Sequence, residues 1–255
     1  MISKTNKAFM LSLNIFKLGL KKTKDRLKFD GQVGSFQKEL VLNKKNLPTL
    51  SAVFRIKNEE AYLETSVTSI APICTEIIIV DNNSSDNSLD ICYKLQKCLK
   101  EICNIKIYSY KNKLSIAGEN YYKDLSESSS LAAYYTFAFS KATSDYVMKA
   151  DAHLLYVPLA LKKIQKKLKQ KRRVIIFKGV ELYGMNLSFE RYVFKNDSSF
   201  TFIDGKSYEE LQFNYKLSKW EQLRSTIITP CFIHFKRIRY INDLNSHNLV
   251  ENLYK

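Results

Sequence analysis

Short apolar runs alternate with amphipathic stretches from Leu50 onward, and this alternation constrains the fold more than any other feature of the sequence. The runs are LSAVFRI (50–56), EIIIV (76–80), NIKIYSY (104–110), DYVMKA (145–150) and VIIFKG (174–179). Runs with little polar interruption are typical of strands that are buried on both faces of a parallel sheet. The sequence therefore predicts an α/β fold, with a mainly parallel central sheet flanked by helices.

Helical periodicity fills the intervals between these runs. An apolar stripe recurs in the first interval at Leu63, Val67 and Ile70, and Asn58 is placed to cap that helix, with two glutamates in its first turn. Further helices are expected around 89–99 and, behind a serine cap, at 128–143. Strand and helix thus alternate along the chain, as in folds whose strands are joined by crossover helices.

Composition favours one large domain in a reducing compartment. The chain has 255 residues, 45% of them hydrophobic, and its seven glycines and four prolines are too few for a linker-rich or disordered protein. No apolar run approaches the roughly 18 residues of a spanning helix. Five cysteines form no CxxC pair, so we expect a cytoplasmic protein without disulfides.

The net charge of +16 predicts a polyanionic partner such as nucleic acid, anionic lipid or a phosphorylated substrate. Much of this charge lies in LKKIQKKLKQKRR (161–173), where apolar residues recur at helical spacing at Val157, Leu161, Ile164 and Leu168. We expect a helix that buries this stripe and exposes its cations. These cations face either solvent alone or an anionic surface. Charge by itself does not distinguish between the two.

Polar side chains follow three of the predicted strands. They are Arg55, Lys57 and Asn58 after the first, Asp81 to Asp86 after the second, and Asp151 with His153 after the fourth. Ligands of parallel sheets bind at the carboxyl ends of the strands, so these residues are expected to share one edge. No GxGxxG or GxxxxGK[ST] loop is present. Phosphates bound there would need a metal ion or basic side chains, and Asp151 with His153 could hold that metal.

Residues 50–90 resemble the N-terminal half of family 2 glycosyltransferases of the GT-A fold. That family has an RxxNE-like turn after its first strand and a VDNxSxDxT-like end to its second, and the matching residues here are Arg55, Asn58, Glu59, Asp81, Asn82, Ser84 and Asp86. TSDYVMKADAH occupies the place of the family's DxD motif, and the stretch 134–155 looks closest to bacterial surface-polysaccharide members. The resemblance covers roughly residues 48–156.

The resemblance implies a GT-A-like nucleotide-sugar-binding fold and the transfer of a sugar, with inversion, from a UDP-linked donor. The acceptor would be a glycan or a lipid-linked glycan in surface polysaccharide synthesis. We expect a basic extension at 1–48, a nucleotide-sugar-binding half at 49–179 and an acceptor-side part of the same domain at 180–255. The residues implied in donor binding are Arg55, Asn58, Glu59, Asp81, Asn82, Asp151 and Lys236.

The resemblance also implies a divalent ion, Mn²⁺ or Mg²⁺, on the donor diphosphate. Asp151 and His153 would hold this ion, and His234 from the C-terminal part would complete the site. The family's Asp-x-Asp is Asp-Ala-His in this chain, and imidazole is a competent but less hard ligand than carboxylate. The alternative to an active enzyme is therefore a catalytically degenerate relative that binds a nucleotide sugar or a protein partner.

An inverting transferase needs a general base near the acceptor hydroxyl, usually a carboxylate. The segment 180–211 offers Glu181, Glu190, Asp204, Glu209 and Glu210. Glu190, between aromatic residues in SFERYVF, is our first prediction, and Asp204 is the second.

Two other classes of protein are supported by fewer features of the sequence. A nucleic-acid binder is supported by charge alone, without an RRM or helix-turn-helix pattern, so no specific nucleic-acid partner is expected. A sugar-phosphate nucleotidyltransferase would need a glycine-rich basic loop, which RIKNEE does not supply. The basic helix predicts a peripheral location on the anionic inner face of the cell membrane.

Overall fold

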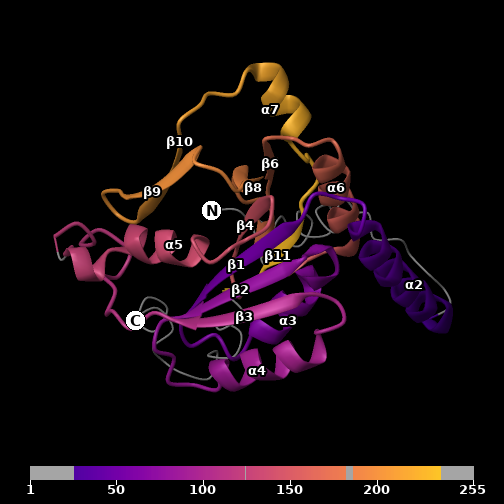
Figure 1. Ribbon diagram of the computed structural model, residues 1–255, viewed down its shortest axis with the longest axis horizontal. Helices are drawn as coiled ribbons and strands as arrows, with labels where there is room; N and C mark the ends of the chain where they lie inside the picture. Colours follow the sequence, from indigo (N-terminus) through magenta and orange to yellow (C-terminus); the bar gives the residue numbers. More distant parts are fainter. Residues whose placement is uncertain (1–25, 124, 182–185, 237–255) are drawn as a thin grey trace, which may run out of the picture.

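The computed structural model describes residues 26–123, 125–181 and 186–236, which are built around a six-stranded sheet (Figure 1). In spatial order the strands are β3 (Asn104–Ser109), β2 (Glu76–Asp81), β1 (Leu50–Ile56), β4 (Tyr146–Ala150), β8 (Glu190–Lys195) and β6 (Val174–Phe177). The strands β1 to β4 are parallel, whereas β8 runs antiparallel to both of its neighbours. The predicted α/β fold with a mainly parallel sheet is confirmed.

Helices cover both faces of this sheet because the buried strands supply apolar side chains to each face in turn. Phe54 packs into the cluster that includes α3 (Leu63–Ile70), α4 (Ser88–Cys98) and α6 (Pro158–Lys169). Its neighbour Val53 packs into the opposite cluster with α5 (Leu131–Phe139). Two short 3₁₀ turns, η1 (Ala71–Ile73) and η2 (Glu127–Ser129), precede β2 and α5 respectively. None of the helices in the described ranges is long and apolar enough to cross a membrane.

Two smaller elements pack against opposite faces of the central sheet. The hairpin of β9 (Phe200–Asp204) and β10 (Glu209–Phe213) lies over α5, where the Phe202 ring packs against Tyr135 and Phe139. A short sheet joins β5 (Leu154–Tyr156), β11 (Phe232–His234) and β7 (Val180–Glu181). The strand β11 brings the C-terminal part of the chain beside the residues that directly follow β4. The helix α7 (Lys219–Ser225) links the hairpin back to this region.

The end of the predicted N-terminal extension packs on the domain. Residues 26–44 form α2 (Arg26–Lys44), and Leu40 is only 1% exposed within the core. Gln165 of α6 donates a hydrogen bond to the Leu40 carbonyl at 2.8 Å, and the Lys44 ammonium donates to the Cys74 carbonyl at 2.7 Å. The last part of the predicted basic extension is therefore a helix that Leu40 anchors to the domain, and the boundary at residue 48 stays a prediction. Residues 1–25 lie outside the described ranges.

The sequence predicts most helices correctly but misplaces one start. The helix expected directly after Asn58 begins at Leu63, with Tyr62 at its N-cap and no side-chain cap. Asn58 instead adopts a left-handed conformation, with φ of 56°, and bonds to another loop. The serine cap is confirmed in α5, where Ser130 Oγ accepts a hydrogen bond from the Ala133 amide at 2.9 Å. The stripe on the cationic helix is also buried, at Val157, Leu161, Ile164 and Leu168.

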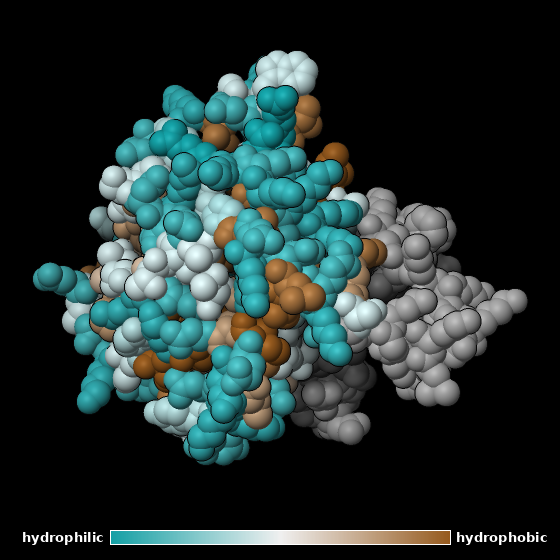
Figure 2. Space-filling model, turned by 45° about the vertical axis from the view of Figure 1, so that its right-hand side comes forward, coloured by the Kyte–Doolittle hydropathy of each residue, from teal (hydrophilic) through white to brown (hydrophobic). Residues whose placement is uncertain are grey.

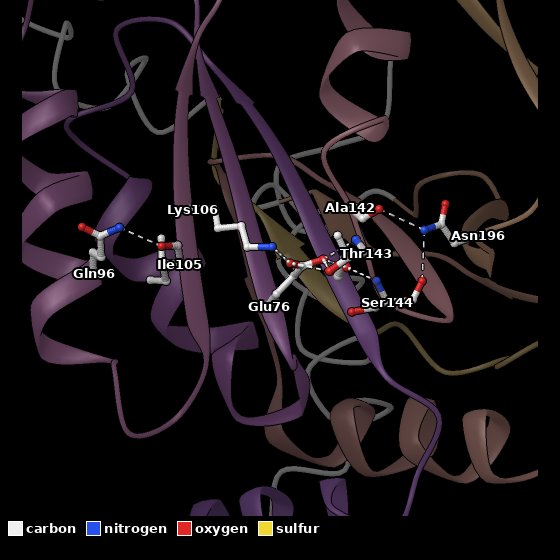
Figure 3. Close-up of polar contacts among 9 residues, drawn as sticks. Glu76, Gln96, Ile105, Lys106, Ala142, Thr143, Ser144 and Asn196 are labelled. Atoms are coloured by element: carbon white, nitrogen blue, oxygen red, sulfur yellow. Dashed lines mark hydrogen bonds and ion pairs between the residues drawn. The ribbon is translucent and has the colours of Figure 1, made fainter.

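Glu76 joins the amino ends of several strands (Figure 3). Its carboxylate accepts hydrogen bonds from the Ser51 hydroxyl of β1, from Lys106 Nζ of β3 at 2.7 Å and from the Thr143 amide before β4 at 2.6 Å. Asn196 Nδ2 holds the same turn by donating to the carbonyls of Ala142 and Ser144. Only 5% of the Glu76 side chain is exposed. This carboxylate therefore fixes β1, β2, β3 and the start of β4 relative to one another.

We predict that Glu76→Gln destabilises the fold at pH 7 by about 1–3 kcal/mol, since it weakens several hydrogen bonds to a buried charged group. Burial acts to raise the pKa of Glu76, but the bonds from Lys106, Ser51 and Thr143 outweigh it and lower the pKa. A carboxylate of this kind stabilises the fold above its unfolded pKa of about 4.3 and loses that contribution as pH falls through its folded value.

Urea unfolding between pH 7 and pH 3 measures this contribution. The stability of Glu76→Gln should depend less on pH than that of the parent protein across the acid range. The matched control is Glu64→Gln, which breaks an exposed pair with Lys94 at 3.2 Å and should change stability by less than about 0.5 kcal/mol. Equal losses in the two variants would contradict the role given to Glu76.

Candidate functional site

Two loops at the carboxyl ends of β1 and β2 hold each other through residues of the sequence motif. Asn58 Oδ1 accepts a hydrogen bond from the Ser85 amide at 2.8 Å, and the Asn58 amide donates to Ser84 Oγ at 2.9 Å. Asp86 accepts from the Glu60 amide at 3.0 Å. The left-handed backbone of Asn58 makes the first two bonds possible at once. In this structure, Asn58 and Asp86 shape the edge of the sheet, and donor binding by Asn58 stays a prediction.

Asp81 ends β2 at this edge and is 2% exposed. Its two carboxylate oxygens lie 3.3 and 3.2 Å from the Ser84 amide, which donates to them. Asn82 beside it donates from Nδ2 to the carbonyls of Tyr110 and Asn112, both at 2.8 Å. Asn82 thus holds the segment after β3. The Asp81 carboxylate accepts from one amide and can accept further hydrogen bonds from a ligand.

Arg55 and Asp151 form an ion pair between the neighbouring strands β1 and β4, with Nη2 and Oδ1 2.6 Å apart. Phe54 pairs with Ala150 in the parallel ladder, so the residues that follow them, Arg55 and Asp151, lie at the same level. The guanidinium also lies 3.9 Å from the centroid of the Tyr135 ring. Arg55 is almost fully buried, with a side chain 4% exposed, while 33% of the Asp151 side chain remains exposed.

The charges around Asp151 keep it ionised. Burial acts to raise its pKa, but the positive charges of Arg55, His153, Lys149 and His234 outweigh burial, so the pKa is lowered from its ordinary value. Asp151 is thus an anion at neutral pH, held by a guanidinium that is itself stacked on an aromatic ring.

Two histidines from distant parts of the chain meet beside this ion pair. The rings of His153 and His234 are edge to face, with their centroids 4.8 Å apart. They meet because β11 pairs with β5, which places His234 opposite Leu154, and the Phe235 amide donates to the His153 carbonyl at 2.8 Å.

A carboxylate accompanies each histidine. Glu181 Oε2 lies 2.7 Å from His234 Nδ1, and Glu59 Oε1 lies 3.6 Å from His153 Nδ1. Burial, followed by the charge of His153, lowers the pKa of His234, and Glu181 opposes this shift. Because Glu181 contacts Nδ1 of His234, the other ring nitrogen, Nε2, points away from Glu181.

The residues at this edge fit part of a metal site. His153 Nδ1 and Glu181 Oε1 are buried without a hydrogen-bond partner in the described structure. Glu181 occupies Nδ1 of His234 and leaves Nε2 as a ligand atom, an arrangement common around metal-binding histidines. Among the described residues, no three His, Cys, Asp or Glu side chains are arranged to hold a metal ion. Two imidazoles with the Asp151 anion nearby would therefore need oxygen atoms of a bound phosphate to complete the shell.

Comparison with known protein families identifies the family of this chain. The model of glycosyl transferase family 2 matches residues 51–238, most of the chain. The chain belongs to this family. A search of curated proteins finds none that matches it.

Solved structures with a similar fold include S. aureus TarS 1–349, which has 14% sequence identity and a TM-score of 0.48 and covers 77% of this chain and 66% of its own. Another is glucosyl-3-phosphoglycerate synthase from Mycobacterium tuberculosis in complex with Mn²⁺, UDP and glucosyl-3-phosphoglycerate. The two chains are 18% identical with a TM-score of 0.39, and the alignment covers 57% of this chain and 48% of the synthase. This chain thus spans just under two thirds of the TarS fragment and about half of the synthase.

Glu190, the first candidate base of this family 2 chain, lies at the same edge. It begins β8, which runs antiparallel to β4, so its amino end lies beside the carboxyl end of β4. Glu190 Oε2 is 2.9 Å from Lys149 Nζ, and its side chain is 43% exposed. Glu190 is thus a partly exposed carboxylate held by Lys149 at the carboxyl end of β4, and its role as the base stays a prediction.

Asp204 has a different environment. Its carboxylate accepts hydrogen bonds from Ser130 Oγ at 2.6 Å, from the Ala132 amide at 3.0 Å and from the Tyr121 hydroxyl. Burial acts to raise its pKa, but the bonds from Ser130, Tyr121 and Ala132 outweigh burial and lower the pKa. These contacts join the β9–β10 hairpin to the start of α5. The catalytic role of Asp204 stays a prediction that this environment does not favour.

Sequence reasoning missed the contacts that Tyr135, Glu181 and Glu209 make at this edge. Tyr134 is buried, with its hydroxyl donating to the Val80 carbonyl at 2.7 Å, whereas its neighbour Tyr135 is only half-buried. Tyr135 stacks on Arg55 and hydrogen-bonds to Glu209, whose pKa is raised by burial. Glu181, considered only as a base, is the partner of His234. Local sequence carries no signal for these contacts, because each joins distant segments.

Lys236 is the last predicted site residue and lies at the end of the described ranges. It is exposed, two residues beyond His234. Its proposed contact with a diphosphate stays a prediction.

We predict that Arg55→Leu destabilises the protein by about 2 kcal/mol, because it leaves the Asp151 carboxylate without its closest countercharge. The loss should be smaller than the 3–5 kcal/mol typical of fully buried pairs, since a third of Asp151 reaches solvent. Urea unfolding at pH 7 measures the change. Lys149→Gln, which removes the partly exposed neighbouring pair with Glu190, is the control and should cost less than about 1 kcal/mol. A neutral Arg55→Leu substitution would contradict the importance of this pair.

Proposed function

We propose that this chain transfers a sugar from a UDP-linked donor to a glycan or lipid-linked acceptor in surface polysaccharide synthesis, with inversion and with the help of a divalent ion. The observation that carries the proposal is the convergence of Arg55, Asp81, Asp151, His153 and His234 at the carboxyl edge of the sheet of a family 2 chain. Open α/β sheets bind ligands at this edge, where strand ends leave polar groups unpaired.

Asp81 is the proposed contact to the nucleoside. It lies at the end of β2, where a carboxylate can accept hydrogen bonds from a base N–H or from ribose hydroxyls. Asp151 would contact the ribose or the metal from the next loop, with Arg55 keeping it ionised and oriented. Lys236 would compensate phosphate charge, because the sequence has no glycine-rich loop to cradle phosphates.

His153 and His234, with Asp151 nearby, are the residues that would hold Mn²⁺ or Mg²⁺ together with oxygen atoms of the donor diphosphate. A divalent ion bound there would stabilise the negative charge that develops on the leaving diphosphate. Glu181 fixes the orientation of His234 through Nδ1, and Glu59 lies beside His153. The replacement of the family's second acidic residue by His153 makes the ligand set softer, which favours Mn²⁺ over Mg²⁺.

Glu190 is the proposed general base, which takes the proton from the acceptor hydroxyl as that oxygen attacks the sugar. Lys149 holds its carboxylate at 2.9 Å and keeps it beside the carboxyl end of β4. Asp204 remains the second candidate. Removal of a positioned general base lowers turnover by a factor on the order of 10² to 10⁴.

We further propose a peripheral location on the inner face of the cell membrane, where a lipid-linked acceptor would be found. The lysine-rich α6 supports this location through charge. The alternative function, a degenerate relative that binds a nucleotide sugar or partner without turnover, is favoured by a single observation, the histidine at position 153.

The donor site is tested with thermal shifts against a panel of nucleotide sugars, with Mn²⁺, with Mg²⁺ and with EDTA. We expect stabilisation by one UDP-sugar with Mn²⁺, its loss in Asp81→Ala and Asp151→Ala, and its retention in His153→Asp, which restores a carboxylate. Asp90→Ala removes an exposed carboxylate of α4 and should bind as the parent protein does. If EDTA leaves the shift unchanged, the metal role of Asp151, His153 and His234 is wrong.

The base is tested by comparing Glu190→Gln with Asp204→Asn under saturating donor and acceptor. Glu190→Gln should lower kcat by about 10² or more while the donor-dependent thermal shift stays unchanged. Asp204→Asn should lower the melting temperature of the free protein, because it disturbs the bonds to α5. The reverse pattern would make Asp204 the base, and donor binding without turnover by the parent protein would favour the degenerate alternative.

A further inference from the structure

The helix α7 carries large hydrophobic side chains into solvent. Trp220 is 75% exposed and Leu223 is 58% exposed, and their three-residue spacing places them on one side of the helix. Ile228, just beyond the helix, is 71% exposed. Three large apolar side chains within nine residues have a cost in water that a folded domain normally avoids by burying them.

The cations of α6 lie beside Ile228 and contact the C-terminal end of α7. Lys163 Nζ donates to Thr229 Oγ1 at 2.7 Å, and Lys167 Nζ donates to the carbonyl of Arg224 in α7. Ile228 shares a shallow hollow of about 340 Å³ with Lys163, Lys166 and Lys167. Figure 2, which brings the right-hand side of Figure 1 forward, shows hydrophobic residues set among hydrophilic ones on this part of the surface. We call Trp220, Leu223, Ile228, Lys163, Lys166 and Lys167 the α6–α7 face.

The positive charge of this region is largely uncompensated. Of the eight lysines and arginines at 161–173, only Lys162 forms an ion pair with a carboxylate of the described chain, Glu39 at 2.7 Å. Burial, then the charges of Arg172 and Lys166, lower the pKa of Lys167. Glu221 is the acidic residue of α7, and it caps its own helix through Ser218. An external anion would therefore relieve repulsion that the described residues leave in place.

We propose that the α6–α7 face docks on the surface of an anionic phospholipid membrane, with Trp220, Leu223 and Ile228 entering the interfacial region and the lysines meeting the headgroups. Tryptophan favours this region because its ring is apolar and its N–H finds polar partners. Stable attachment without a spanning helix needs two signals, and hydrophobic insertion with basic charge supplies both. A second copy of this chain fits less well, because docking like faces would bring uncompensated cations together.

The α6–α7 face also lies near the proposed site. His234 is six positions beyond Ile228 in the chain, so their backbones are at most about 22 Å apart. A lipid-linked acceptor in the same membrane could therefore reach the site. This step deepens the proposed function and rests on it for the class of acceptor, whereas membrane docking itself rests on the α6–α7 face alone.

Tryptophan fluorescence tests the docking, because Trp220 is the single tryptophan of the chain. The full chain is mixed with vesicles of phosphatidylcholine alone or with 30% phosphatidylglycerol. We expect a blue shift of the emission and quenching by brominated lipid with the anionic vesicles only, both reversed at about 0.5 M salt because screening weakens the attraction. A shift that depends on protein concentration without vesicles would indicate self-association and overturn the proposal.

Vesicle flotation of variants separates the two signals. Leu223→Ser with Ile228→Ser, and separately Lys163→Gln, Lys166→Gln and Lys167→Gln together, should each weaken binding by about tenfold or more. The controls are Ile116→Ser, at a 78% exposed isoleucine elsewhere, and Lys97→Gln with Lys100→Gln and Lys111→Gln, which remove equal charge; both should bind as the parent protein does.

Flotation of the parent protein without a change in Trp220 emission would mean that another segment binds, and the proposal would be wrong. The donor-dependent thermal shift should be unchanged in the Leu223→Ser, Ile228→Ser variant, so failure of docking and failure of the donor site are measured separately.

Discussion

The register of β1 between β2 and β4 is the constraint on which the rest of the structure depends. In this register Ile56 pairs with Asp81 and Phe54 with Ala150, so Arg55, Asp81 and Asp151 all lie within a residue or two of one level. A slip of one residue would turn every side chain of β1 to the opposite face and separate Arg55 from Asp151. Bonds at the other end of the strands oppose such a slip, above all those of the buried Glu76. Hydrogen bonds at the amino edge of the sheet thus fix the strand register on which the arrangement of residues at the carboxyl edge depends.

The carboxyl edge concentrates groups that are costly to bury and matches them in pairs. Arg55 neutralises Asp151 and stacks on Tyr135, Glu181 bonds to His234, and Glu190 meets Lys149. Five buried side-chain polar atoms lack partners in the described structure, and two of them, His153 Nδ1 and Glu181 Oε1, belong to this edge. Unpaired groups of this kind are unfavourable in a finished core, and they are expected where a ligand supplies the missing contacts.

A concentration of positive charge lies on α6. The described cations of α6 gather on the outside of the domain, beside the exposed hydrophobic residues of α7, while the paired carboxylates lie at the ends of the strands. The segment from Ile228 to His234 connects the two regions, because β11 pairs with β5 and carries His234 to His153. The segment 228–234 therefore contributes residues both to a surface suited to an anionic partner and to a site suited to a polar ligand.

The sequence by itself determined five of the six strands of the central sheet, the buried stripe of α6, the Ser130 cap and the meeting of polar residues at one edge, because each follows from local periodicity and from the direction of parallel strands. The motif residues at 55–59 and 81–86 also indicated the family, which is confirmed. Only the tertiary structure decided that Asn58 bonds to the 84–85 loop instead of capping a helix, and that Tyr135, not Tyr134, faces Arg55. It also placed Asp204 at the start of α5 and Glu181 on His234, 53 residues away. Such contacts depend on which distant segments the packed core brings together, and no local pattern of residues encodes that choice.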